Sequence, residues 1–153
     1  MRSVRRWGAL LVLFGGAPLL AHHTGGKPVV EQPWVREVIP GQEATSAYLA
    51  IKNRDHEADV LLGATCDEAQ SVEIHTMKNQ SGRMIMKKLD SLPLPARGEI
   101  VFAPGGNHLM LFGLKHPFRS GERVRLTLNF KEAGKVEVEA PVKRQELEHD
   151  AHP

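Results

Sequence analysis

Three short segments of the chain each carry two side chains that can bind a metal, separated by one residue. The pairs are His75 with Met77, Met84 with Met86, and His108 with Met110. Side chains two positions apart in a strand point to the same face, so each pair presents both groups together. The turn sequence NQSG, residues 79–82, predicts a hairpin that sets the first two pairs side by side, and the third pair follows the loop PGGN. Ligands from a hairpin and from the start of a neighbouring strand can converge at one end of a barrel.

These donor types favour a soft metal. Thioether sulfur is neutral and soft and selects Cu(I) over zinc, calcium or magnesium, and imidazole also suits copper. Zinc would ask for thiolates or for histidines with carboxylates, and the sequence shows no such cluster. The alternative is structural, because methionines on strands are most often gap fillers in a core and a single histidine is seldom a ligand. The residue types alone leave both interpretations open.

Residues 28–142 predict one all-β domain of short apolar runs separated by turn sequences. In the last long run, Val124, Leu126, Leu128 and Phe130 alternate with polar residues and therefore share one face. Only residues 64–70 could hold a helical turn. Many short strands at regular spacing indicate a β-sandwich or β-barrel. The predicted strands are 29–38, 46–53, 59–66, 70–77, 83–89, 98–103, 108–114, 122–130 and 135–141.

Residues 1–21 predict a signal peptide, with a basic start, an apolar run and the small residue Ala21 for cleavage. The alternative, a membrane anchor, is disfavoured because the run is short and is interrupted by Gly15, Gly16 and Pro18. We therefore expect export to the periplasm, without stable membrane insertion after processing. Because no cysteine follows the run, we do not expect lipid attachment there. Residues 22–27 form a flexible lead-in, and residues 143–153 form a charged, mobile tail.

The charge and cysteine content exclude other classes. Residues 1–21 hold three of the 20 Lys and Arg residues, which leaves 17 against 18 Asp and Glu, a net charge of −1. We therefore expect no nucleic-acid partner, which would require a basic stripe. The chain has a single cysteine, Cys66, so it forms no internal disulfide. We interpret Cys66 as a small buried hydrophobic residue and expect a monomer; the alternative is a reactive or dimer-forming thiol.

The spacing of four of the residues above resembles that of a known family. Ten residues separate His75 from Met86, twenty-one separate Met86 from His108, and one separates His108 from Met110. This pattern resembles the metal-binding signature of the periplasmic copper chaperones of the PCu(A)C type. The family's opening segment and its two ligand strands are similar to QPWVREVIPGQEATSAYLAIKN, SVEIHTM and PGGNHLMLFGLKHP. The resemblance covers roughly residues 28–130 of the chain.

The resemblance implies a cupredoxin-like Greek-key β-barrel or sandwich that binds Cu(I) at its surface. It also implies delivery of copper for assembly of the CuA centre of cytochrome c oxidase, with a copper-receiving partner such as an oxidase subunit or another copper chaperone. We interpret Met84, which shares a face with Met86, as a neighbour of the site or a core residue, and Met77 as an exposed or shielding neighbour. Carried over by position, the metal ligands are His75, Met86, His108 and Met110.

Two other copper functions and one metal-free function compete with this interpretation. A blue-copper electron carrier needs a ligand cysteine close before a histidine and a methionine, but Cys66 lies in the wrong region. A copper-dependent oxidative enzyme could use His22 as its mature amino terminus, but the sequence HHTGGK is too flexible to hold a fixed catalytic geometry. We therefore expect no enzymatic activity. A metal-free adhesion or interaction module is the alternative if no copper binds.

The two ends of the mature chain carry the remaining hypothesis. Cu(II) prefers nitrogen and oxygen donors, and His22 and His23 lie beside a free amine after processing. His149 and His152 lie among carboxylates in the tail. These ends could capture Cu(II), which passes to the core ligands after reduction. With only two histidines at each end, solvated linkers are the competing interpretation.

Overall fold

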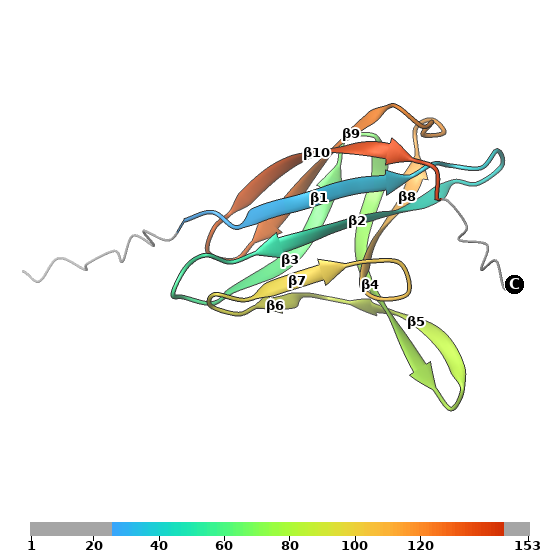
Figure 1. Ribbon diagram of the computed structural model, residues 1–153. Helices are drawn as coiled ribbons and strands as arrows, with labels where there is room; N and C mark the ends of the chain where they lie inside the picture. The colour runs from blue at the N-terminus through green and yellow to red at the C-terminus, as the bar shows by residue number, and fades with distance from the viewer. Residues whose placement is uncertain (1–25, 146–153) are drawn as a thin grey trace, which may run out of the picture.

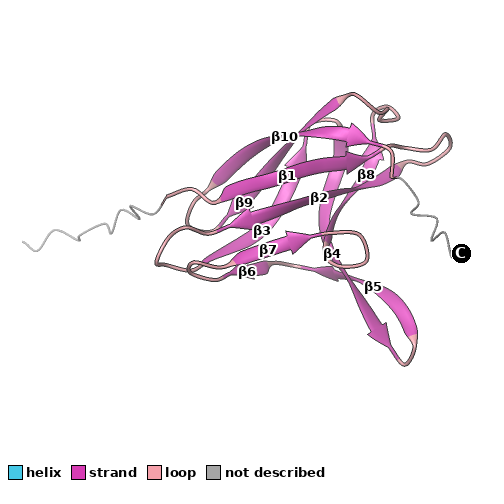
Figure 2. Ribbon diagram, viewed as in Figure 1, coloured by secondary structure: helices cyan, strands magenta, loops and turns pink. Residues whose placement is uncertain are grey.

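The computed structural model describes residues 26–145, and it contains strands and turns but no helix in that range (Figure 2). No described segment is therefore a helix long and apolar enough to cross a membrane. The predicted signal peptide, most of the lead-in and most of the tail lie outside the described residues. The strands are β1 Val29–Arg36, β2 Ala44–Lys52, β3 Asp59–Cys66, β4 Ala69–Gln80, β5 Arg83–Leu89, β6 Leu92–Leu94, β7 Glu99–Phe102, β8 His108–Leu114, β9 Arg123–Phe130 and β10 Lys135–Lys143.

Seven of these strands close into a barrel in the order β4-β8-β2-β1-β10-β9-β3, and β3 pairs with β4 to complete the ring (Figure 1). The β1–β10 pair is parallel, and the other neighbours in the ring are antiparallel. Closure matters because an open sheet would leave unpaired N–H and C=O groups along its edges. Strands β5, β6 and β7 lie outside the ring and pair with β4, β3 and β2. The predicted all-β barrel is confirmed.

Most predicted strands agree with the observed ones, and three have identical bounds: β3, β5 and β8. Strand β6 was missed because Pro93 lies in it and the surrounding sequence reads as a turn; proline is tolerated at such an edge position. The helical turn considered for residues 64–70 does not form. Instead, β3 continues to Cys66 and β4 begins at Ala69.

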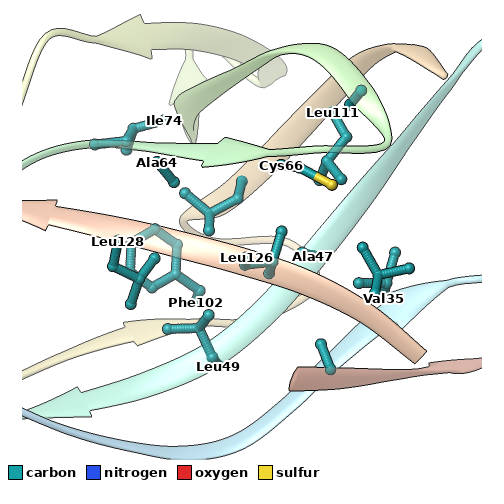
Figure 3. Packing of buried hydrophobic residues seen from close by; sticks show 14 of the residues in the cluster. Val35, Ala47, Leu49, Ala64, Cys66, Ile74, Phe102, Leu111, Leu126 and Leu128 are labelled. Carbon is teal, nitrogen blue, oxygen red and sulfur yellow. The ribbon is translucent and has the colours of Figure 1, made fainter. Parts of the chain in front are cut away.

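The barrel interior is a continuous apolar core (Figure 3). The alternating residues of β9 point into it as predicted: Val124, Leu126 and Leu128 are fully buried, and Phe130 is nearly so. Cys66 is also buried among these side chains, which confirms its interpretation as a small hydrophobic residue. Burial raises the pKa of its thiol. The largest fully buried side chains in the core are Phe118, Ile51, Leu61, Leu94, Leu109, Leu111, Leu126 and Leu128.

Strand β4 is longer than its neighbours and continues past the barrel wall. Its first part pairs with β8 as far as His75, whereas its last part pairs with β5 in the predicted hairpin. Asn79 stabilises the hairpin turn, because its Oδ1 accepts a hydrogen bond of 2.9 Å from the N–H of Gly82. Residues 76–88, called the arm below, therefore project from the barrel (Figure 1).

The core predicts a large difference in stability between alanine substitutions of two leucines on neighbouring strands, one buried and one exposed. Leu126→Ala should lower the free energy of unfolding by about 2–5 kcal/mol, because it leaves a cavity in a closed core. Leu62→Ala is the matched control on β3, since its side chain is 51% exposed, and it should change that free energy by about 0.5 kcal/mol or less. Urea denaturation followed by circular dichroism measures both. Equal losses at the two positions would contradict the assignment of the core.

Candidate metal centre

Strand register places the predicted ligands on the outer face of the barrel. Ile74 on β4 lies opposite Leu109 on β8, and both side chains are buried in the core. The next pair along, His75 opposite His108, must therefore point away from the core. Met110 follows two residues later on the same face, opposite Glu73. The barrel wall thus presents two imidazoles and a thioether in one outward row.

The arm brings a second thioether to this row. Met86 on β5 contacts His108, with 3.2 Å between Sδ of Met86 and Nε2 of His108. The rings of His75 and His108 lie 5.8 Å apart between centroids. Met110 is held from β2, because the hydroxyl of Ser46 donates a hydrogen bond of 3.5 Å to its Sδ. All four predicted ligands therefore gather on one face, although their role as ligands stays a prediction.

The proton on His108 is fixed by a backbone carbonyl. Nδ1 of His108 lies 3.1 Å from the carbonyl oxygen of Gly106. A carbonyl can only accept, so Nδ1 carries the proton and Nε2 of the neutral ring keeps a lone pair. That lone pair faces Met86 Sδ, which is also only an acceptor. Two neutral electron-pair donors with no hydrogen between them are an arrangement that a soft cation stabilises.

The same argument applies to His75. Its Nε2 donates to Oε2 of Glu73 at 2.8 Å, and its Nδ1 is buried with no hydrogen-bond partner. A buried polar atom without a partner costs free energy, and a metal ion bound at Nδ1 would remove that cost. The ring is only 7% exposed and packs against Phe112, with 6.0 Å between ring centroids. His75 is therefore oriented with one nitrogen available for a ligand bond.

Glu73 is the residue that orients His75, and sequence reasoning missed it. Its second carboxylate oxygen accepts a hydrogen bond of 2.8 Å from Nζ of Lys88 on the arm. The Lys88 ammonium, and after it His75, holds the pKa of Glu73 below its usual value of 4.5. The carboxylate thus stays ionised well below neutral pH and keeps the Nε2 proton of His75 in place. The sequence could have indicated this contact, because Glu73 lies two residues before His75 and therefore on the same face of the strand.

The potential donors gathered at this face are imidazole nitrogens and thioether sulfurs. Within residues 26–145, no three His, Cys, Asp or Glu side chains gather closely enough to hold a metal ion. The thioether sulfurs among these donors are of the kind that suits a soft metal such as Cu(I). Cys66 lies in the barrel core near Leu111 and Leu126 (Figure 3), whereas the strand register directs the two histidines to the outer face, so the thiol does not reach them.

The environments of two further methionines, Met84 and Met77, agree only in part with the predictions from the sequence. Met84 was interpreted as a neighbour of the site or a core residue; the core interpretation is wrong, because the side chain is 54% exposed on the arm. Its partner across the hairpin is Asn79, so the arm carries it away from the barrel. Met77 is partly buried directly opposite Met86, in agreement with a shielding role. The terminal histidines proposed for Cu(II), which lie outside the described residues, stay a prediction: His22, His23, His149 and His152.

The chain is similar to known proteins over most of its length. A family model described as "Putative lipoprotein LpqE-like" matches residues 29–142. A putative lipoprotein of Leifsonia xyli subsp. xyli is 33% identical over 115 residues, which are 74% of this chain and 68% of that protein.

Solved structures share the fold. The copper-bound PCuAC domain from PmoF2 is 27% identical with a TM-score of 0.67, and the match covers 80% of this chain and 97% of that one. The CuI-DR1885 solution structure from Deinococcus radiodurans is 32% identical with a TM-score of 0.64, covering 82% of this chain and 84% of that one. The predicted cupredoxin-like barrel is therefore confirmed.

The orientation of His75 by Glu73 predicts a positioning effect on metal binding. Glu73→Gln should lower Cu(I) affinity by about 10- to 100-fold, because it removes the charged acceptor that fixes the ring. Competition with a coloured Cu(I) chelator measures the affinity. Glu139→Gln is the control, since Glu139 also pairs with cations on the barrel surface but lies on β10. An unchanged affinity for Glu73→Gln would show that Glu73 has no positioning role.

Proposed function

Because this chain belongs to the LpqE-like family of PCuAC-type proteins, we propose that it is a copper chaperone with a Cu(I) site of two histidines and two methionines. The proposed ligands are His75, Met86, His108 and Met110. Copper is the cargo of this site, so the site must both hold the ion and release it. The family is one of copper chaperones rather than enzymes, in agreement with the expected absence of catalysis.

One observation carries the proposal. Nε2 of His108 and Sδ of Met86 lie 3.2 Å apart, with no hydrogen between them when the neutral ring carries its proton on Nδ1, and Nδ1 of the nearby His75 is buried without a partner. Backbone and carboxylate acceptors hold the proton of each imidazole on the other nitrogen. These neutral groups need not lose a proton to bind a cation, and they are too soft for calcium or magnesium.

The exposure of the ligands supports transfer rather than permanent binding. Both histidines are 7% exposed, whereas Met86 is 52% exposed at the base of a projecting arm. A receiving protein can therefore approach the metal from the Met86 side and replace this thioether first. Thioethers are flexible and neutral, so exchanging one for a donor of the partner requires no proton transfer.

We place the protein in the periplasm after removal of residues 1–21, and a relative named as a lipoprotein supports export. Its partner is a copper-receiving protein, either a subunit of cytochrome c oxidase that acquires CuA or another copper chaperone. A blue-copper carrier is disfavoured because the only thiol of the chain lies inside the barrel core. Absence of an intense blue colour with Cu(II) would agree with this exclusion.

The site predicts a defined Cu(I) stoichiometry and a mixed donor set. At one equivalent of Cu(I), X-ray absorption should show nitrogen and sulfur scatterers, because imidazole and thioether converge there. Met86→Ala and Met110→Ala should each lower the Cu(I) affinity by at least about tenfold. Loss of a residue that only hydrogen-bonds to a ligand already costs about that much, and loss of a ligand should cost more. Met77→Leu is the control and should leave the first equivalent unchanged. A first shell without sulfur would falsify the ligand assignment.

The ligands also predict how affinity depends on pH. Protonated histidine cannot bind metal, and free histidine titrates near pH ~6.5, so Cu(I) affinity should fall as the pH drops through that range. Above it the affinity should be flat, because thioethers do not titrate. Glu73 titrates at lower pH than the histidine range, since hydrogen bonds from Lys88 and His75 lower its pKa from the usual 4.5.

Chelator competition between pH 5 and 9 measures this profile. A thiolate ligand would instead give an affinity that keeps rising to pH 9, because burial raises the pKa of Cys66. Cys66→Ala is the matched control and should reproduce the profile of the unaltered protein. A profile that differs between the two proteins would overturn the four-ligand assignment.

A further inference from the structure

The two faces of the arm differ in chemistry. Across the hairpin, Met77 lies opposite Met86, and Asn79 lies opposite Met84, while Ile85 lies opposite Lys78. Residues that pair directly share a face, and alternate residues of a strand share it too. Three methionines therefore lie on one face of the arm, which also carries Lys88, and the other face carries Lys78, Ile85 and Lys87. The residues Met77, Met84 and Met86 are called the methionine face below.

Two of the three residues of the methionine face, Met84 and Met86, are exposed in a way that a packing role does not explain. Six large hydrophobic side chains are exposed among the described residues, and three of them are consecutive on β5. Met84 and Met86 are more than half exposed, so neither fills a gap in the core. Contiguous exposed apolar groups on a soluble domain mark a site of interaction. A row of thioethers also has a specific chemistry, which a row of leucines would lack.

The register places the three methionines on adjacent positions of one face, so that their flexible side chains could reach one ion. Side chains directly opposite each other, such as Met77 and Met86, have Cβ atoms about 5 Å apart. Met84 and Met86 are about 7 Å apart along the strand. Methionine has three rotatable bonds and can close these gaps. The backbone of Met77 is fixed, because its N–H donates a hydrogen bond of 3.3 Å to the carbonyl oxygen of Gly106.

We propose that Met77, Met84 and Met86 form a second, weaker Cu(I) position on the arm, and that the thioether of Met86, which has two lone pairs, bridges this position and the main site when both are filled. This inference rests on the proposed function, because it treats Met86 as a ligand there. A site with thioethers alone is neutral and open to solvent, whereas the main site adds two shielded imidazoles and therefore binds more tightly. Cu(I) can move between the two positions by exchanging ligands around Met86, with no change of oxidation state and no proton transfer.

The test follows each methionine by NMR in the full chain, with 13C-labelled methionine methyl groups. The chain has five methionines, so single Met→Leu variants at Met77, Met84, Met86 and Met110 assign four signals and leave that of Met1 by elimination. The first equivalent of Cu(I) should shift the methyl signals of Met86 and Met110. The second equivalent should shift those of Met77 and Met84, and Ag(I), a soft diamagnetic probe, should do the same. A double variant, Met77→Leu with Met84→Leu, should lose the second equivalent and keep the first, which also shows that it folds.

The matched control is Ile85→Ala, which alters an exposed apolar side chain on the opposite face of the same strand and should retain both equivalents. If the first equivalent binds but the second leaves Met77 and Met84 unmoved, the second position does not exist and the methionine face is only an apolar surface. If Cu(I) shifts Met77 and Met84 but never Met110, the main site fails while the arm position stands. A loss of the second equivalent in Ile85→Ala as well would also overturn the assignment.

Discussion

The pairing of β4 with β8 is the constraint on which the site depends. In this register, His75 lies opposite His108, while the adjacent pair, Ile74 and Leu109, fills the core. A shift of one residue would reverse every side chain, so that the histidines would point into the barrel and leucines into solvent. The apolar core therefore fixes the relative positions of the proposed metal ligands. Stability and function are linked here because successive side chains of β4 and β8 alternate between the core and the outer face.

The two histidines and Met110 on the outer face are each held by a hydrogen bond to a neighbouring group, which acts either as an acceptor or as a donor. Glu73 is an acceptor for His75 and for Lys88, the carbonyl of Gly106 accepts from His108, and Ser46 donates to Met110. These contacts come from β2, β4, the arm and the loop before β8, so the closed barrel holds them at fixed relative positions. The result is a set of neutral nitrogen and sulfur atoms whose lone pairs accept few hydrogen bonds. Such a set favours a soft cation.

Much of this arrangement could be predicted from the sequence, for identifiable reasons. Turn residues and alternation located the strands, and β3, β5 and β8 have their predicted bounds. The i, i+2 spacing and the NQSG hairpin predicted that the methionines and histidines share faces. The closing β3–β4 pair and the short β6 could not be predicted, because they depend on contacts between distant segments and on Pro93 at an edge. Glu73 was missed because its hydrogen bonds with His75 and with Lys88 on the arm depend on side-chain positions that residue types and spacing do not give.

The outermost position of β5 has a consequence for the behaviour of the molecule at high concentration. Barrel closure removes the sheet edges, but β5 pairs only with β4 among the described strands and leaves one edge with open backbone groups. Such an edge is a template for strand addition by another copy, and apolar side chains on it increase that hazard. Arg83, Lys87 and Lys88 place three cations along this strand. Like charges would meet if two arms aligned edge to edge, so the same strand that exposes its thioethers also resists self-assembly.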